Sequence, residues 1–97
     1  MPTYVVLLRY TQKGIETIKE GPARLDAAKK TFAAAGGSIK ASYLTMGRYD
    51  VVAIVEAPDD ATIAGLALAG GTQGNFRSET MRAFPEDEMR KIIASLP

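Results

Sequence analysis

The sequence predicts an α+β domain with the element order β-α-β-β-α-β, followed by one more helix. Four short segments, residues 3–10, 38–45, 50–57 and 75–84, are predicted to form strands, and the first and third are rich in Val, Leu and Ile. The two longer segments between them carry apolar residues at helical spacing, and glycine or proline stands near most of the boundaries. Because crossover connections are right-handed, both long helices should cover the same face of a four-stranded antiparallel sheet.

The first half of the chain is expected to hold one strand, a short helical piece and a long helix. Residues 3–10 form the strand, and Ile15 and Ile18 mark one or two helical turns after it. The long helix covers residues 22–35 and begins at Pro22, a residue suited to a first helical position. A glycine pair supplies its left-handed stop. Its apolar face consists of Leu25, Ala28, Phe32 and Ala35.

The second half is expected to contribute three strands and two helices. The strands cover residues 38–45, 50–57 and 75–84, and a short hairpin joins the first two. One helix opens at Pro58-Asp59-Asp60, with acidic residues at its positive end, and ends near Gly70-Gly71. The last helix follows a proline and carries an apolar stripe of Met89, Ile92, Ile93 and Leu96. This order is the ferredoxin-like split βαβ arrangement, in a single domain over residues 1–97.

The hairpin at Gly47-Arg48 decides which side chains share a face of the sheet. With a two-residue II′ turn, Leu44 pairs with Val51 and Tyr43 with Val52. One face then carries Ile39, Ala41, Tyr43, Val52 and Ile54, and the other carries Lys40, Ser42, Leu44, Val51, Ala53 and Val55. We expect the first, bulkier face to lie under the helices and the second to line a cavity or a subunit contact. A longer loop would slip the register and exchange the two faces.

Two features of the sequence predict that copies of the chain assemble. Residues 4–8 and 51–55 are apolar on both faces, although the open face of a half-covered sheet normally carries polar residues. The simplest cover for that face is a second copy, in a homodimer or a higher oligomer. Residues 61–76 carry no charge. Their helical part either exposes alanine methyl groups or packs on another subunit, with Gly65 allowing close approach.

The composition limits the chemistry that the chain can perform. Twelve basic and eleven acidic side chains give a net charge of +1, which provides no electrostatic reason to bind nucleic acid or a membrane. Cysteine and histidine are absent, so disulfides, thiolate catalysis and imidazole acid–base chemistry are excluded. We expect no cofactor and no metal. The N-terminal sequence has neither the basic region nor the cleavage site of a signal peptide, and a cytoplasmic location is expected.

The strongest local motif is Gly47-Arg48-Tyr49-Asp50 at the tip of the predicted hairpin. Its Gly47, Tyr49 and Asp50 match the residues for which the GYD domain family is named. Residues 2–7, 55–60 and 74–77 are also similar to that family, and the chain resembles it over nearly its whole length. The resemblance implies a ferredoxin-like fold of the dimeric α+β barrel type. It implies no particular reaction.

Two interpretations of the tip remain open. In the structural one, Gly47 supplies a positive-φ turn position, Asp50 accepts backbone N–H bonds and Tyr49 caps the sheet. In the functional one, Arg48, Tyr49 and Asp50 form a polar cluster at the mouth of a cavity, where Arg48 holds an anionic ligand. A second set of candidates at or near strand ends could hold a planar acidic molecule. This set consists of Arg9, Tyr10, Tyr43 and Arg82.

Three functions are compatible with these observations, and the sequence identifies no catalytic residue. The first is a homo-oligomeric binding module whose paired sheets enclose a small apolar or aromatic ligand. The second is a cofactor-independent enzyme, isomerase-like or monooxygenase-like, in which Tyr43, Tyr49 and Asp50 orient a reactive aromatic substrate. The third is a structural or regulatory subunit that acts through a protein partner.

Overall fold

A computed structural model describes the protein over residues 1–97. The strands are β1 (Thr3–Tyr10), β2 (Ser38–Leu44), β3 (Val51–Glu56) and β4 (Phe76–Ala83). The helices are α1 (Gln12–Glu16), α2 (Gly21–Ala34), α3 (Asp60–Gly71) and α4 (Glu86–Ala94), and the short 3₁₀ helix η1 (Ile18–Glu20) leads from α1 into α2. The predicted α+β class and the ferredoxin-like order of elements are confirmed.

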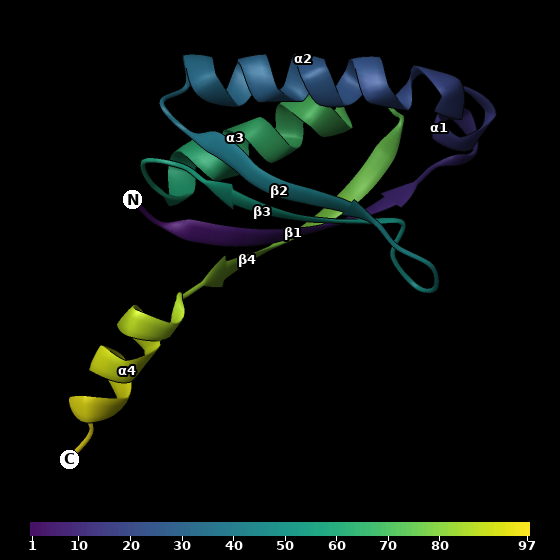
Figure 1. The fold of residues 1–97 in the computed structure, drawn as a ribbon. Helices are drawn as coiled ribbons and strands as arrows, with labels where there is room; N and C mark the ends of the chain where they lie inside the picture. Colours follow the sequence, from purple (N-terminus) through teal and green to yellow (C-terminus); the bar gives the residue numbers. More distant parts are fainter.

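The sheet has the strand order β2-β3-β1-β4, and all neighbouring strands are antiparallel. Helices α2 and α3 lie over the same face of the sheet, and the opposite face has no helix on it (Figure 1). Helix α4 follows β4 and projects away from the rest of the chain, on the side of the uncovered face (Figure 1). The protomer is therefore a two-layer fold, with helices on one face of the sheet and no layer on the other face.

The helix ends follow from local chemistry. Asp59 caps α3, because its carboxylate accepts a hydrogen bond of 2.8 Å from the backbone N–H of Thr62. Helix α2 ends before Gly36, whose φ of 85° is a left-handed conformation that favours glycine. Gly37 is needed for a different reason, since a Cβ at this position would lie 2.3 Å from the carbonyl oxygen of Glu56. The predicted glycine stop is confirmed.

The hairpin between β2 and β3 has the predicted register. Leu44 pairs with Val51 and Tyr43 pairs with Val52. Gly47 takes a φ of 120°, so the turn does use its freedom to adopt a positive φ. The regular ladder ends at Leu44, and the loop beyond it is longer than a two-residue turn.

The predicted assignment of the two sheet faces is wrong in one respect, because the bulkier face does not lie under the helices; the second face does line a cavity, as expected. The side chains buried under the helices on β3 are Ala53 and Val55, which belong to the face expected to line a cavity or a subunit contact. The bulkier face, with Ala41, Tyr43, Val52 and Ile54, is the uncovered one. Ile39 leaves that face because a β-bulge interrupts the register between Ile39 and Ala41. The size of the side chains did not predict which face the helices cover, because the helices leave a cavity over part of the sheet instead of packing on it along its whole length.

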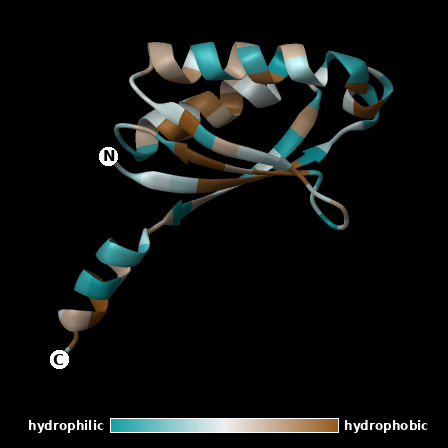
Figure 2. Ribbon diagram, viewed as in Figure 1, coloured by the Kyte–Doolittle hydropathy of each residue, from teal (hydrophilic) through white to brown (hydrophobic).

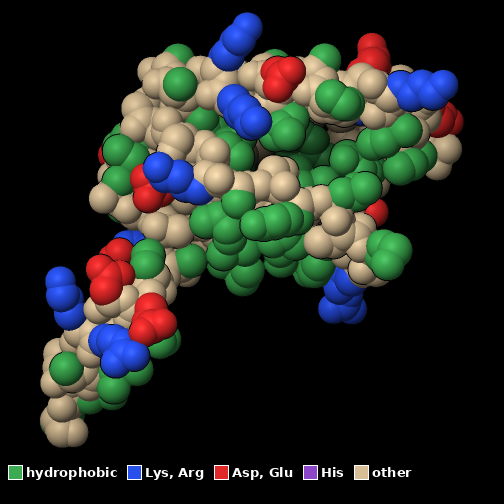
Figure 3. Space-filling view, in the orientation of Figure 1, with side chains coloured by type: hydrophobic (Ala, Val, Ile, Leu, Met, Phe, Trp, Pro, Cys, Tyr) green, Lys and Arg blue, Asp and Glu red, His purple; other side chains and the backbone are tan.

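The middle of the uncovered face of the sheet is apolar, while Arg9, Arg77 and Glu79 lie on the same face toward the C-terminal end of β1. Tyr43 of β2 and Met81 of β4 expose 60% and 48% of their surfaces. Between them the two central strands present Val5, Leu7, Val52 and Ile54. Figure 2 shows hydrophobic colour in the central strands, and Figure 3 shows hydrophobic side chains gathered along the underside of the sheet. One protomer leaves this surface in water, as the apolar strand pattern predicts.

Helix α4 also leaves apolar side chains exposed. Met89, Ile92, Ile93 and Leu96 are all exposed, and Ile93 exposes 57% of its surface. An ion pair of 3.9 Å between Arg82 and Glu88 connects the helix to β4. No helix of the protein has both the length and the apolar character needed to cross a bilayer.

Candidate functional site

The main hollow of the protomer is a cavity of about 500 Å³ between the helices and the sheet. Of the 22 residues that line it, 16 are hydrophobic. Ligand sites in proteins have volumes of roughly 300–1,000 Å³ and mostly apolar walls. In Figure 3 the hollow is visible between α2 and the strands below it, with hydrophobic side chains on its walls. The cavity therefore has the size and the character of a small-molecule site.

Each wall of the cavity comes from a predicted apolar pattern. Leu25, Ala28 and Phe32 of α2 form one wall, which confirms the helical stripe expected there. Ile63, Leu66 and Ala67 of α3 form a second wall. The floor is the sheet, which contributes Val6, Leu8, Tyr10, Ile39, Ser42, Leu44, Val51, Ala53, Val55, Phe76, Ser78 and Thr80.

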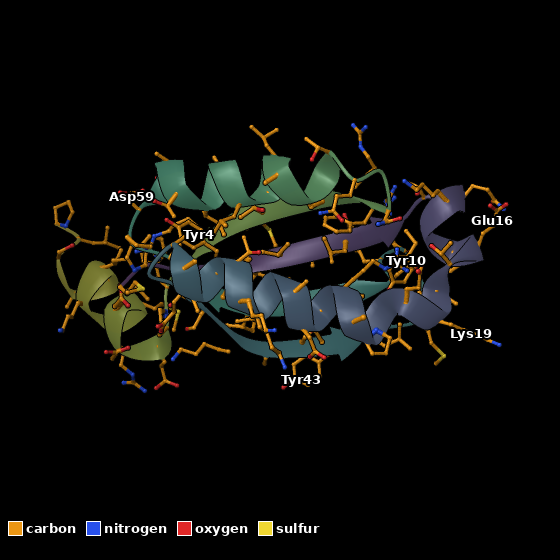
Figure 4. All side chains as sticks on the ribbon, turned by 90° about the horizontal axis from the view of Figure 1, so that it is seen from above. Tyr4, Tyr10, Glu16, Lys19, Tyr43 and Asp59 are labelled. Carbon is orange, nitrogen blue, oxygen red and sulfur yellow. The ribbon has the colours of Figure 1, made fainter.

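One end of the space between the helices and the sheet is closed. Tyr4, at the start of β1, is buried, and its hydroxyl donates a hydrogen bond of 2.5 Å to a carboxylate oxygen of Asp60 in α3. This hydrogen bond, burial of the ring and the negative charge of Asp60 raise the pKa of Tyr4 above its usual value. Figure 4 shows Tyr4 and Tyr10 at opposite ends of the sheet, with Tyr10 near α1.

The open end of the cavity contains its only charged lining residue, Arg24 of α2. The sequence analysis did not single out this residue. The signal was nevertheless present, because Arg24 lies four positions before Ala28 and therefore on the same helical face as the apolar stripe. A cation on the apolar face of an amphipathic helix is an exception that marks a site worth testing.

The hairpin-tip residues do not form one cluster. The Asp50 carboxylate accepts a hydrogen bond of 2.8 Å from the backbone N–H of Tyr10, so it ties the hairpin to β1. The Tyr49 hydroxyl donates to Glu79 at 2.8 Å, and the Arg9 guanidinium lies 5.0 Å from the centre of the Tyr49 ring. Arg48 is exposed at the tip. These contacts support the structural role that was expected for Asp50, and any ligand contact of Arg48 stays a prediction.

The second set of candidates is also divided by the sheet. Tyr10 alone lines the cavity, whereas Arg9 and Tyr43 belong to the uncovered face. Arg82 lies at the closed end, where its guanidinium is 5.7 Å from the Tyr4 ring centre and 4.3 Å from that of Phe84. The seven candidates thus lie at the hairpin tip, in the cavity, on the uncovered face and at the closed end, and the protomer does not bring them together around one ligand.

The comparison with known families decides where the chain belongs. The GYD domain matches residues 4–93. The chain is a member of the GYD domain family. A relative from Thermus thermophilus is 35% identical over 86 residues, which make up 88% of this chain and 90% of the relative. That relative is named glutamine synthetase and cystathionine beta-lyase binding protein.

Solved structures share the fold of this GYD domain protein. The leucine response regulatory protein LrpA of Mycobacterium tuberculosis superimposes with a TM-score of 0.65 and 15% identity over 87% of this chain. The present chain spans about half of that protein, 51% of its length. A 5-chloro-2-hydroxyhydroquinone dehydrochlorinase of Burkholderia phenoliruptrix, solved with 2,5-dihydroxybenzoquinone, has a TM-score of 0.61 and 16% identity, covering 90% of this chain and 97% of its own. At these identities the likeness shows the fold alone.

Proposed function

We propose that this protein is a homodimeric binding module that holds a small, largely apolar molecule in the helix–sheet cavity of each protomer. The cavity carries the proposal: about 500 Å³ of space with 16 hydrophobic residues among the 22 that line it. An empty apolar cavity costs stability in proportion to its volume, and a ligand that fills it recovers the lost contacts. The sequence analysis placed the ligand between paired sheets, whereas this cavity lies on the opposite face of the sheet.

Pairing of two copies is supported by the uncovered sheet face. The middle of that face presents apolar side chains between Tyr43 and Met81, with charged residues toward one end, and exposed apolar patches of this kind mark interaction sites. A second copy is the natural cover, because it brings an equally apolar face with the same need of burial. The net charge of +1 means that two copies do not repel each other strongly.

The ligand part of the proposal is tested with the neutral fluorescent probe N-phenyl-1-naphthylamine. We expect saturable binding, seen as an increase in probe fluorescence. Ala28→Phe should abolish it, because Ala28 lines the cavity and the larger ring would fill it. The matched control is Ala27→Phe, one position away on the exposed surface of α2, which should bind the probe like the wild type. Binding that survives Ala28→Phe would remove the cavity from the proposal.

The dimer part is tested by light scattering. We expect the wild-type mass to be that of two chains, and Val52→Asp to give monomers, because Val52 lies in the middle of the uncovered face. The control is Ala64→Glu, which places a charge on the exposed side of α3 and should leave the mass unchanged. A wild-type monomer at micromolar concentration would contradict the proposal. Loss of the dimer in Ala64→Glu would move the interface to α3.

A second candidate function is the binding of an enzyme, and the name of the Thermus relative is the observation that favours it. Helix α4 is the surface suited to such a contact, since its apolar stripe is exposed and the helix projects away from the rest of the chain. The test mixes the purified protein with glutamine synthetase or cystathionine beta-lyase of the same host and follows comigration on a sizing column. Ile92→Glu combined with Ile93→Glu should abolish comigration and leave probe binding intact. A variant that becomes a monomer would instead assign α4 to the contact between copies.

A further inference from the structure

Arg24 is held in a fixed position at the open end of the cavity. Its Nη2 donates hydrogen bonds to the carbonyl oxygens of Gly14, at 3.2 Å, and Thr17, at 2.8 Å. Gly14 is itself buried against the residue before β4, because a Cβ there would lie 1.9 Å from the carbonyl oxygen of Asn75. The guanidinium is therefore anchored to the segment around α1. This segment packs closely on the end of the sheet because residue 14 is a glycine. Three of the five guanidinium N–H donors remain for another acceptor.

Arg24 forms no ion pair with a carboxylate of the protomer. The ion pairs of the protein are Lys40–Glu56, Arg82–Glu88 and Arg90–Glu86, and Arg24 takes part in none of them. No acidic residue is among the 22 that line the cavity. A half-buried cation beside apolar walls is favourable only if an anion or water compensates it. A ligand that carries a negative charge would supply the missing partner.

We propose that the cavity takes a monocarboxylic acid with an apolar body, and that Arg24 binds its carboxylate. This inference rests on the proposed ligand-binding function. The apolar body lies against residues such as Leu8, Phe32 and Leu66, and the acid group lies at the end near Tyr10. A carboxylate matches the planar guanidinium and a single positive charge. A phosphate dianion would bring a second negative charge into a cavity that has no second cation.

The test compares acids with neutral molecules of the same shape as competitors of N-phenyl-1-naphthylamine at pH 8. The pairs are decanoate with 1-decanol, and 1-naphthoate with 1-naphthalenemethanol. In the wild type we expect the acid of at least one pair to displace the probe at about tenfold lower concentration than its alcohol. The pair that shows the preference also reports whether the apolar body is a flexible chain or a flat ring.

Two variants connect the preference to Arg24. Arg24→Gln should remove the difference between acid and alcohol while the probe still binds. Arg77→Gln removes the same charge from the other face of the sheet near the same end, and it should keep the preference. Equal potency of acid and alcohol with the wild type, or an intact preference in Arg24→Gln, would overturn the inference and leave the proposed function standing. A wild type that does not bind the probe at all would refute the proposed function itself. The wild-type comparison remains decisive even if Arg24→Gln fails to fold.

Discussion

The two ends of the space between the helices and the sheet are built differently from similar residues. Tyr4 and Tyr10 both lie on β1 and both face the helices. Tyr4 is 2% exposed, and its hydroxyl is bonded to α3. Tyr10 borders an open cavity, and Leu44 of β2, which lines the same cavity, is 79% exposed. The core cluster lies toward the closed end, although three of its members, Ala53, Val55 and Ile63, also border the cavity, and the open end leaves apolar side chains exposed.

The two ends separate the residues that stabilise the folded protomer from the residues that border the proposed ligand site. At the closed end apolar surface is buried by the chain itself, so it contributes to folding. At the open end, the α1–η1 segment occupies the corner between α2 and the sheet, and Ile18 of η1 and Pro22 of α2 line the cavity. Substitutions at the closed end should therefore change the free energy of unfolding, and substitutions at the open end should mainly change ligand affinity.

The largest effect is expected at the closed end. Ile63→Ala should lower the free energy of unfolding by about 2–5 kcal/mol, because Ile63, although it also borders the cavity, is 5% exposed and packs in the core cluster with Tyr4, so its truncation leaves a void there. Leu68→Ala on the same helix should change it by less than about 0.5 kcal/mol, since Leu68 is 73% exposed. Urea denaturation measures both. Similar losses in the two variants would show that the closed end is not the core.

A truncation at the open end should cost less. Leu8→Ala removes a side chain that borders a cavity which already exists, so little new void is created. We expect a loss of about 1 kcal/mol in the free energy of unfolding, together with a clear loss of affinity for N-phenyl-1-naphthylamine. A loss as large as that of Ile63→Ala would mean that the open end is packed in solution and would remove the contrast between the ends.

The tyrosine pair sharpens the same contrast. Tyr4→Phe removes the hydrogen bond to Asp60 and should lower the melting temperature by a few degrees, whereas Tyr10→Phe should leave it nearly unchanged. The pKa of Tyr4 is raised in the folded state. Its stabilising contribution is therefore complete below the unfolded pKa of about 10 and is lost as the pH rises through the folded value. Melting curves between pH 8 and 11 should show this alkaline loss in the wild type and less of it in Tyr4→Phe.

The smallest effect concerns the cap of α3, which holds the closed end in place. Hydrogen bonds from the side chain and the backbone of Thr62 lower the pKa of Asp59. The contribution of Asp59 is present above its unfolded pKa of about 4 and is lost as the pH falls through the lower folded value. Asp59→Asn should keep the stability at neutral pH and weaken the acid loss. Asp26→Asn in α2 changes the net charge equally, and an identical acid response of the two variants would contradict the capping effect.

Local patterns predicted the fold well and the candidate site only in part. The stripe of Leu25, Ala28 and Phe32 identified the helix face that lines the cavity, because 3.6-residue spacing is visible in any sequence. Arg24 was missed, since its significance depends on Gly14 and Thr17 fixing the guanidinium and on its lack of an ion-pair partner. The tip and strand-end residues predicted as candidates do not lie together in the structure, because residues at strand ends alternate between the faces of the sheet.

The sequence by itself determined the order of the elements, the ends of α2 and α3 and the hairpin register, because spacing, caps and turn residues act over a few positions. It also determined that the chain has more apolar strand surface than one protomer buries. Only the tertiary structure decided which face the helices cover and that a cavity remains beneath them. These outcomes depend on the bulge next to Ile39 and on how α1 seats against the residue before β4, which are contacts between segments far apart in the chain.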